Sequence, residues 1–113
     1  MRNHRVLYSL DLQMKEDYRI NSNIIRLAES CFGFTKKDVD EEERYSITAS
    51  FLSLFTPSDM RKKVTAFLRT QPEIHYIDVV YRYETEMTPD RFVIWSDGRS
   101  QEYTGHVYYE EDK

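Results

Sequence analysis

The hydrophobic periodicity of this chain changes along its length between two residues and about 3.6 residues, the spacings of a strand and of a helix. Apolar and polar residues alternate over residues 5–13 and again over residues 45–54. Elsewhere, apolar residues recur at helical intervals in two separate segments. A chain with this pattern is expected to build a sheet from amphipathic strands and to cover one face of that sheet with helices.

The first predicted helix lies between Ile20 and Gly33, where apolar residues are spaced three or four positions apart. Gly33 is a natural end, because glycine readily adopts the left-handed conformation that terminates a helix. The sequence leaves open whether residues 15–20 form the first turn or a loop. A polar residue near the start can cap the helix, and there are three candidates: Asn21, Ser22 and Asn23.

The second predicted helix has the clearest start in the chain. Thr56 supplies a capping hydroxyl, Pro57 suits the first turn, and Asp59 places a carboxylate three residues after the cap. Pro72 prevents the helix from continuing. One apolar stripe follows the cap at helical spacing: Met60, Val64, Phe67 and Leu68.

Three further strands are predicted after the second helix. The first spans residues 75–85 and the second spans residues 91–96. Asp97-Gly98 is typical of a two-residue hairpin turn in which both residues have positive φ. This turn leads to a last strand within residues 100–109.

These elements predict one α+β domain over residues 1–113, in the order β-α-β-α-β-β-β. We expect a ferredoxin-like fold, a split β-α-β variant with two helices on one face of a mainly antiparallel sheet and a C-terminal β-hairpin. In that fold two strands usually lie between the helices, whereas here the gap holds one clear strand and the polar residues 35–44. We expect those residues to form an exposed loop, because their five acidic side chains repel one another: Asp38, Asp40, Glu41, Glu42 and Glu43.

The composition argues against several classes of function. Cys31 is the single cysteine and cannot form an internal disulfide, and no apolar run is long enough to span a bilayer. We therefore expect a cytoplasmic protein without a membrane contact. The net charge of −4 argues against non-specific DNA binding. With three scattered glycines and three scattered histidines, the chain has no phosphate-binding loop and no metal-ligand spacing, so we expect no cofactor.

Asp11 is the main candidate for chemistry. It lies near the end of the first strand, on the face that the helices would leave uncovered. Two copies of Asp11 across a dimer axis can hold Mg²⁺ or Mn²⁺, which prefer oxygen ligands; alternatively, Asp11 pairs with an arginine or caps a loop. A second candidate group lies in the second helix, where Arg61, Lys62 and Lys63 suit a phosphate backbone or serve only as solubilising charge.

Residues 6–12 resemble the first strand of small ferredoxin-like nucleases: the CRISPR adaptation nuclease family, the VapD-like ribonucleases and the GhoS-like antitoxin ribonucleases. Residues 46–50, 58–60 and 72–78 are similar to the corresponding segments of GhoS-like proteins. The resemblance covers about residues 5–83. It implies a homodimer that cleaves RNA in a toxin–antitoxin or phage-defence setting, and Asp11 is the one residue that matches a functional position.

The sequence is compatible with two functions. We favour a small non-enzymatic interaction protein that acts as an inhibitor, antitoxin or regulator of a protein or nucleic-acid partner, with the acidic residues 38–43 as its contact for a basic partner. The alternative is a dimeric metal-dependent endoribonuclease with Asp11 as catalytic residue and metal ligand and residues 61–63 on RNA. The uncovered sheet face, with Leu7 and Leu52, predicts a homodimer unless the C-terminal hairpin folds across it.

Overall fold

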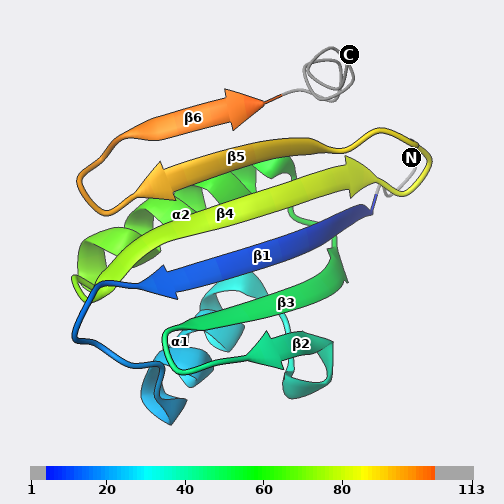
Figure 1. The fold of residues 1–113 in the computed structure, drawn as a ribbon. Helices are drawn as coiled ribbons and strands as arrows, with labels where there is room; N and C mark the ends of the chain where they lie inside the picture. The colour runs from blue at the N-terminus through cyan, green and yellow to red at the C-terminus, as the bar shows by residue number, and fades with distance from the viewer. Residues whose placement is uncertain (1–4, 104–113) are drawn as a thin grey trace, which may run out of the picture.

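The computed structural model describes residues 5–103 and has an α+β architecture (Figure 1). Six strands form one antiparallel sheet in the order β2-β3-β1-β4-β5-β6, so the first strand of the chain is at the centre. The elements follow one another as β1 (Val6–Met14), α1 (Ser22–Phe32), a short 3₁₀ helix η1 (Lys36–Asp38), β2 (Val39–Glu42), β3 (Ser46–Ser53), α2 (Pro57–Thr70), β4 (Ile74–Tyr83), β5 (Asp90–Trp95) and β6 (Ser100–Tyr103).

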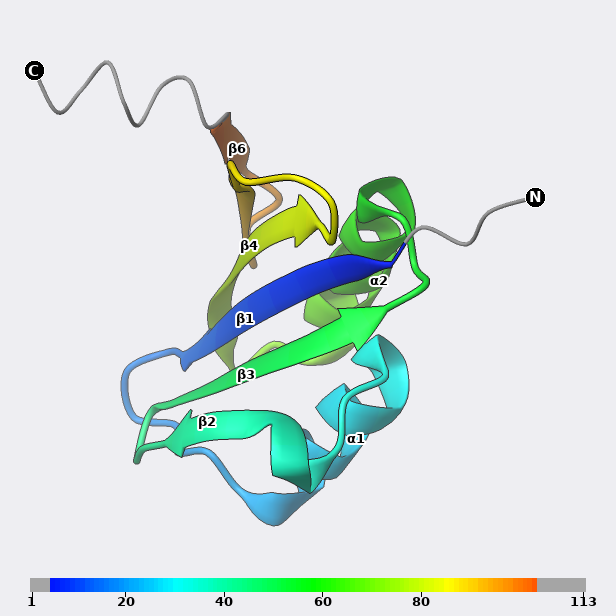
Figure 2. The same cartoon turned by 90° about the vertical axis from the view of Figure 1, so that its right-hand side faces the viewer.

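Both long helices lie on the same side of the sheet, and the opposite sheet face carries no helix (Figure 2). The alternation predicted for β1 is confirmed, since Val6, Tyr8, Leu10, Leu12 and Met14 are all buried under the helices. Buried side chains of both helices complete this core. The polar residues between them on β1 therefore face away from the core, as the period of a strand requires.

The helix boundaries follow from local capping. Asn21 caps α1, because its side-chain oxygen accepts a 2.9 Å hydrogen bond from the Ile24 amide, and residues 15–20 lie outside the helix. Gly33 ends α1 with φ of 87°, as predicted. The predicted start of α2 is also confirmed, since the Thr56 hydroxyl accepts a 3.1 Å hydrogen bond from the Asp59 amide.

The prediction that residues 35–44 form a loop is wrong. This segment contains η1 and β2, and β2 pairs antiparallel with β3. The Asp38 carboxylate accepts a 2.8 Å hydrogen bond from the Thr35 amide, which fixes the turn before the strand. A run of like charges is compatible with a strand here because β2 is at the edge of the sheet, where its side chains remain solvated.

The segment after β4 extends the sheet on its other side. β5 pairs with β4, and β6 pairs with β5, both antiparallel. In the turn between β5 and β6 only Gly98 has a positive φ, of 95°, so the prediction that Asp97 shares this conformation is wrong. The Gly98 amide donates to the Trp95 carbonyl at 3.0 Å, which fits a type I turn followed by a left-handed glycine. The predicted last strand extends beyond residue 103 and therefore partly outside the described residues.

Neither α1 nor α2, the two α-helices of residues 5–103, has the length and apolar character that a bilayer-spanning helix needs.

Candidate functional site

The uncovered face of the sheet, which we call the open face, combines polar and apolar side chains. Its central part comes from β1, β3, β4 and β5, whose residues on this side are half-buried or exposed except for the buried Val93. Polar residues in register across these strands include Ser9, Asp11, Gln13, Thr48, Ser50, Asp78 and Arg91. Leu7 and the 44%-exposed Leu52 stand opposite each other at one end of this face.

An arginine–carboxylate pair with two hydrogen bonds lies on the open face. Arg91 on β5 donates two hydrogen bonds to Asp78 on β4, from Nε to Oδ1 at 2.9 Å and from Nη2 to Oδ2 at 2.7 Å. The Arg91 guanidinium also lies 4.9 Å from the ring centroid of Tyr103 on β6. This bidentate geometry engages both oxygens of Asp78, whose side chain is only 16% exposed.

Asp11 lies directly opposite Asp78 across the β1–β4 pair. Its Oδ1 accepts one hydrogen bond, of 3.3 Å, from Nε2 of Gln13 on the same strand. Partial burial raises the pKa of Asp11 above its ordinary value, and the charges of Asp78 and Glu43 add to this effect. The hydrogen bond from Gln13 and the charge of Arg91 act in the opposite direction but do not cancel it.

The side chains around Asp11 in one chain supply few ligands for a cation. Asp78 is the nearest acid across the strands, and its oxygens already accept from Arg91. Within residues 5–103 there is no group of three or more His, Cys, Asp or Glu side chains that could hold a metal ion. A divalent cation at Asp11 would therefore need ligands from a second molecule, as the sequence-based hypothesis also required.

The predicted RNA-binding residues lie on the other side of the sheet from Asp11. Arg61, Lys62 and Lys63 belong to α2, which packs on the helix-covered face. Arg61 forms an ion pair with Glu102, and the ammonium of Lys63 is 4.4 Å from the ring centroid of Phe55. Within one chain, the structure thus does not bring Asp11 and the basic residues of α2 together.

The predicted partner-binding residues form an acidic edge strand. We call Asp40, Glu41, Glu42 and Glu43, which are all exposed on or next to β2, the acidic edge. Asp38 precedes them and is occupied as the cap of η1. The Asp40 carboxylate accepts a hydrogen bond from the Ser50 hydroxyl, whereas those of Glu41 and Glu42 contact no partner among the described residues.

Sequence reasoning missed the pairing of Asp78 with Arg91 on the open face. The two residues are not direct cross-strand neighbours, since Asp78 is opposite Val93 and Arg91 is opposite Val80. A diagonal pair of this kind depends on the register of the β4–β5 hairpin. The available signal was the alternation of β5, which places Arg91 and Val93 on the open face.

Comparison with known proteins adds no relative to this description. No protein-family model matches the chain, and neither a curated protein nor a solved structure shows significant similarity to it.

Proposed function

We propose that this protein is a non-enzymatic interaction protein, an inhibitor, antitoxin or regulator, that binds a basic protein partner through its acidic edge. We also propose that β1, α1, β2, β3, α2 and β4 form a ferredoxin-like unit with strand order β2-β3-β1-β4, to which β5 and β6 are added. In this unit β2 is an outer strand. The exposed position of β2 at the edge of the sheet is the observation that supports the proposed binding of a basic partner.

The charge of the acidic edge supports a basic partner. Glu41 and Glu42 have no hydrogen-bond or ion-pair partner among residues 5–103, so no internal cation has to be displaced when a ligand binds. Adjacent carboxylates of one sign raise the local concentration of a cationic ligand and accelerate its encounter. A lysine- or arginine-rich segment is the ligand whose binding is favoured most by these adjacent carboxylates.

The backbone of β2 supports an extended ligand. One side of β2 pairs with β3, and β2 is the last strand on that side of the sheet (Figure 1). Backbone groups on the outer side of an edge strand can pair with an added strand from another molecule. Backbone pairing would then supply affinity, and the carboxylates would select basic side chains at alternate positions.

A synthetic strand-forming peptide of alternating lysine and valine tests this proposal directly. Calorimetry is expected to detect binding that weakens as the salt concentration rises, and hydrogen exchange of the β2 amides is expected to slow in the complex. The double variant Glu41→Gln/Glu43→Gln should bind the peptide more weakly. The matched control Glu16→Gln/Asp17→Asn removes the same charge from an exposed loop and should bind like the unmodified protein.

Two outcomes would contradict the proposal. The first is equal loss of binding in the β2 variant and in the loop control, which would reduce the effect to net charge. The second is binding without slower exchange in β2, which would place the peptide on another surface.

A second candidate function, a dimeric metal-dependent endoribonuclease, is favoured by the position of Asp11 beside Asp78 on the open face. A dimer formed through this face would place two copies of Asp11 near one axis and could supply the ligands that one protomer lacks. RNA cleavage that requires Mg²⁺ or Mn²⁺ and disappears in Asp11→Asn would support this function. Cleavage that persists in Asp11→Asn would exclude Asp11 as the catalytic residue.

A further inference from the structure

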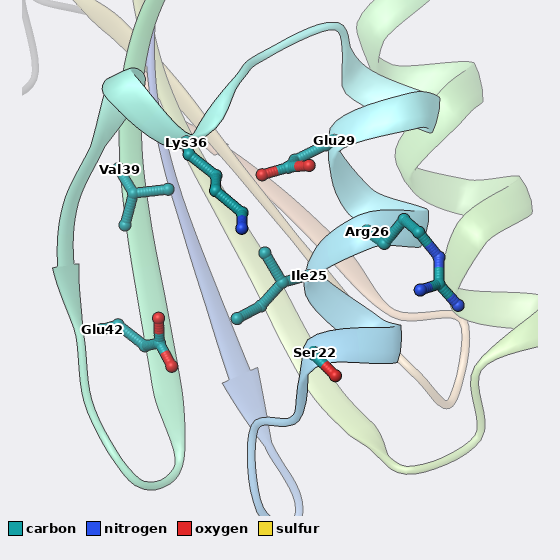
Figure 3. A pocket seen from close by; sticks show the side chains of 7 residues that line it. All are labelled: Ser22, Ile25, Arg26, Glu29, Lys36, Val39 and Glu42. Carbon is teal, nitrogen blue, oxygen red and sulfur yellow. The ribbon is translucent and has the colours of Figure 1, made fainter.

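A cleft of about 560 Å³ lies between α1 and the η1–β2 segment (Figure 3). Its volume falls within the range of small-molecule sites, which is about 300–1,000 Å³. Ile25 of α1 and Val39 of β2 provide apolar lining from opposite sides, and both are half-buried. The cleft is on the helix-covered side of β2 and is therefore separate from the open face.

One acid and one base point into this cleft, and a second acid, Glu42, also lines it. Figure 3 shows the Glu29 carboxylate and the Lys36 ammonium directed into the space between α1 and β2, whereas the Arg26 guanidinium points away from β2. Arg26 instead donates a 2.8 Å hydrogen bond to the Asn23 side chain. Glu29 and Lys36 thus present one acceptor and one donor group on the same small volume.

Both of these groups lack an internal partner. Oε2 of Glu29 is buried and has no hydrogen-bond donor among residues 5–103. Lys36 forms no hydrogen bond and no ion pair through its ammonium within the same residues, and in particular none with Glu29. A buried carboxylate oxygen without a donor is costly, so a ligand ammonium toward which Glu29 turns this oxygen gains affinity there.

The arrangement of these groups selects a class of ligand. The carboxylate of Glu29 requires a cationic donor such as an ammonium group, and Lys36 requires an anionic acceptor such as a carboxylate. Ile25 and Val39 favour a short hydrocarbon group between the two. A diamine could pair with Glu29 and with Glu42, the second acid of the lining, but the ammonium of Lys36 lies in the cleft and repels a second positive charge.

We propose that the cleft between α1 and β2 binds a small aliphatic zwitterion of the α-amino acid class. The ligand ammonium pairs with Glu29, its carboxylate pairs with Lys36, and its alkyl group contacts Ile25 and Val39. Because one wall of the cleft belongs to β2, such a ligand also stabilises the strand that carries the acidic edge. The cleft proposal stands without the peptide-binding function, since its four contact residues lie outside the acidic edge, of which only Glu42 lines the cleft.

Three probes that share a 3-methylbutyl unit test the ligand class on the 113-residue chain. L-leucine carries both charged groups, 3-methylbutylamine lacks the carboxylate, and 4-methylpentanoate lacks the ammonium. Calorimetry or ligand-observed NMR is expected to give the highest affinity for L-leucine, with each single-charge probe weaker by about tenfold or more, because each lacks one of the two charge-assisted hydrogen bonds.

Matched variants locate the site. Glu29→Gln and Lys36→Met are each expected to weaken L-leucine binding by about tenfold or more. The controls Glu16→Gln and Lys37→Met remove the same charges from exposed positions outside the cleft and should bind normally. Circular dichroism of every variant verifies the fold, and Lys36→Met keeps the test valid if Glu29→Gln is unstable, since Lys36 is exposed.

Three results would overturn the proposal. Absence of L-leucine binding at millimolar concentration would reject an amino acid site. Preference for 3-methylbutylamine or for 1,4-diaminobutane would reject the zwitterion in favour of a cation. Equal losses in the cleft variants and in their controls would move the binding site elsewhere.

Discussion

Replacement of Asp11 by asparagine is expected to stabilise the protein at neutral pH. Asp11 faces Asp78 directly across the β1–β4 pair, and its own carboxylate receives a single hydrogen bond, from Gln13. Like charges directly opposite each other in a sheet destabilise it by about 0.2–1 kcal/mol. Asparagine keeps the size of the side chain and an oxygen that can accept from Gln13, so the variant should gain about this much free energy of unfolding.

The gain should depend on pH in a defined direction. Burial and neighbouring carboxylates raise the pKa of Asp11 in the folded protein above its value in the unfolded chain. The folded state then binds the Asp11 proton more tightly than the unfolded chain does. The stability that this proton contributes is fully present below the unfolded pKa of Asp11 and is lost as the pH rises through its folded pKa. The difference between Asp11→Asn and the unmodified protein should therefore be present at pH 7 and nearly absent at pH 3.

Urea unfolding at the two pH values measures this difference. The variant Glu16→Gln is the control, because it removes one acid from an exposed loop and reports the effect of net charge alone. A thermal midpoint higher by about 4–8 °C per kcal/mol would provide an independent reading for a domain of roughly this size. A loss of stability at pH 7, or an equal gain at pH 3, would refute the electrostatic reasoning. A confirmed gain would mark Asp11 as a residue that is retained at a cost to stability, which is common at functional positions.

Three further predictions concern the fold. Arg91→Met should lower the free energy of unfolding by about 1–3 kcal/mol, a range between the values for exposed and for buried ion pairs. Adding Asp78→Asn to this variant should recover most of the loss in urea unfolding. No recovery would mean that loss of the Arg91–Asp78 pair is not the cause. Tyr8→Phe should cost about 1–2 kcal/mol, because the Phe55 carbonyl loses its 2.6 Å hydrogen bond from the Tyr8 hydroxyl, and an unchanged urea midpoint would show that water replaces it. Gly98→Val should cost about 1 kcal/mol or more through its φ of 95° alone, since the space around it is open; a melting temperature equal to that of the unmodified protein would contradict the assigned turn.

Much of the fold could be predicted because its signals are local. The cap at Thr56 with Pro57 determines where α2 begins, and the alternation of β1 determines which of its faces is buried. The alternation also placed Asp11 on the uncovered face. These inferences need only the geometry of one helix or strand, which the neighbouring residues specify.

The errors arose where the tertiary position of a segment decides its structure. Acidic residues 40–43 have poor strand propensity, yet pairing with β3 at the edge of the sheet holds most of them in β2. The bond between Asp78 and Arg91 depends on the register of β4 and β5, which the turn between them does not reveal in sequence. The cleft beside Glu29 could not be predicted for the same reason, because one of its walls is β2, which the sequence predicts as a loop.

The central position of β1 has a consequence for synthesis of the chain. β1 is made first, but its partners β3 and β4 begin only at Ser46 and Ile74. Until β4 has left the ribosome, one side of β1 has no backbone partner, and its buried face lacks part of its covering. Contacts between segments so distant in sequence also slow folding. A nascent chain that stops before Ile74 is therefore expected to remain unfolded and to need protection by a chaperone, whereas release of β4 allows the sheet to close around its oldest strand.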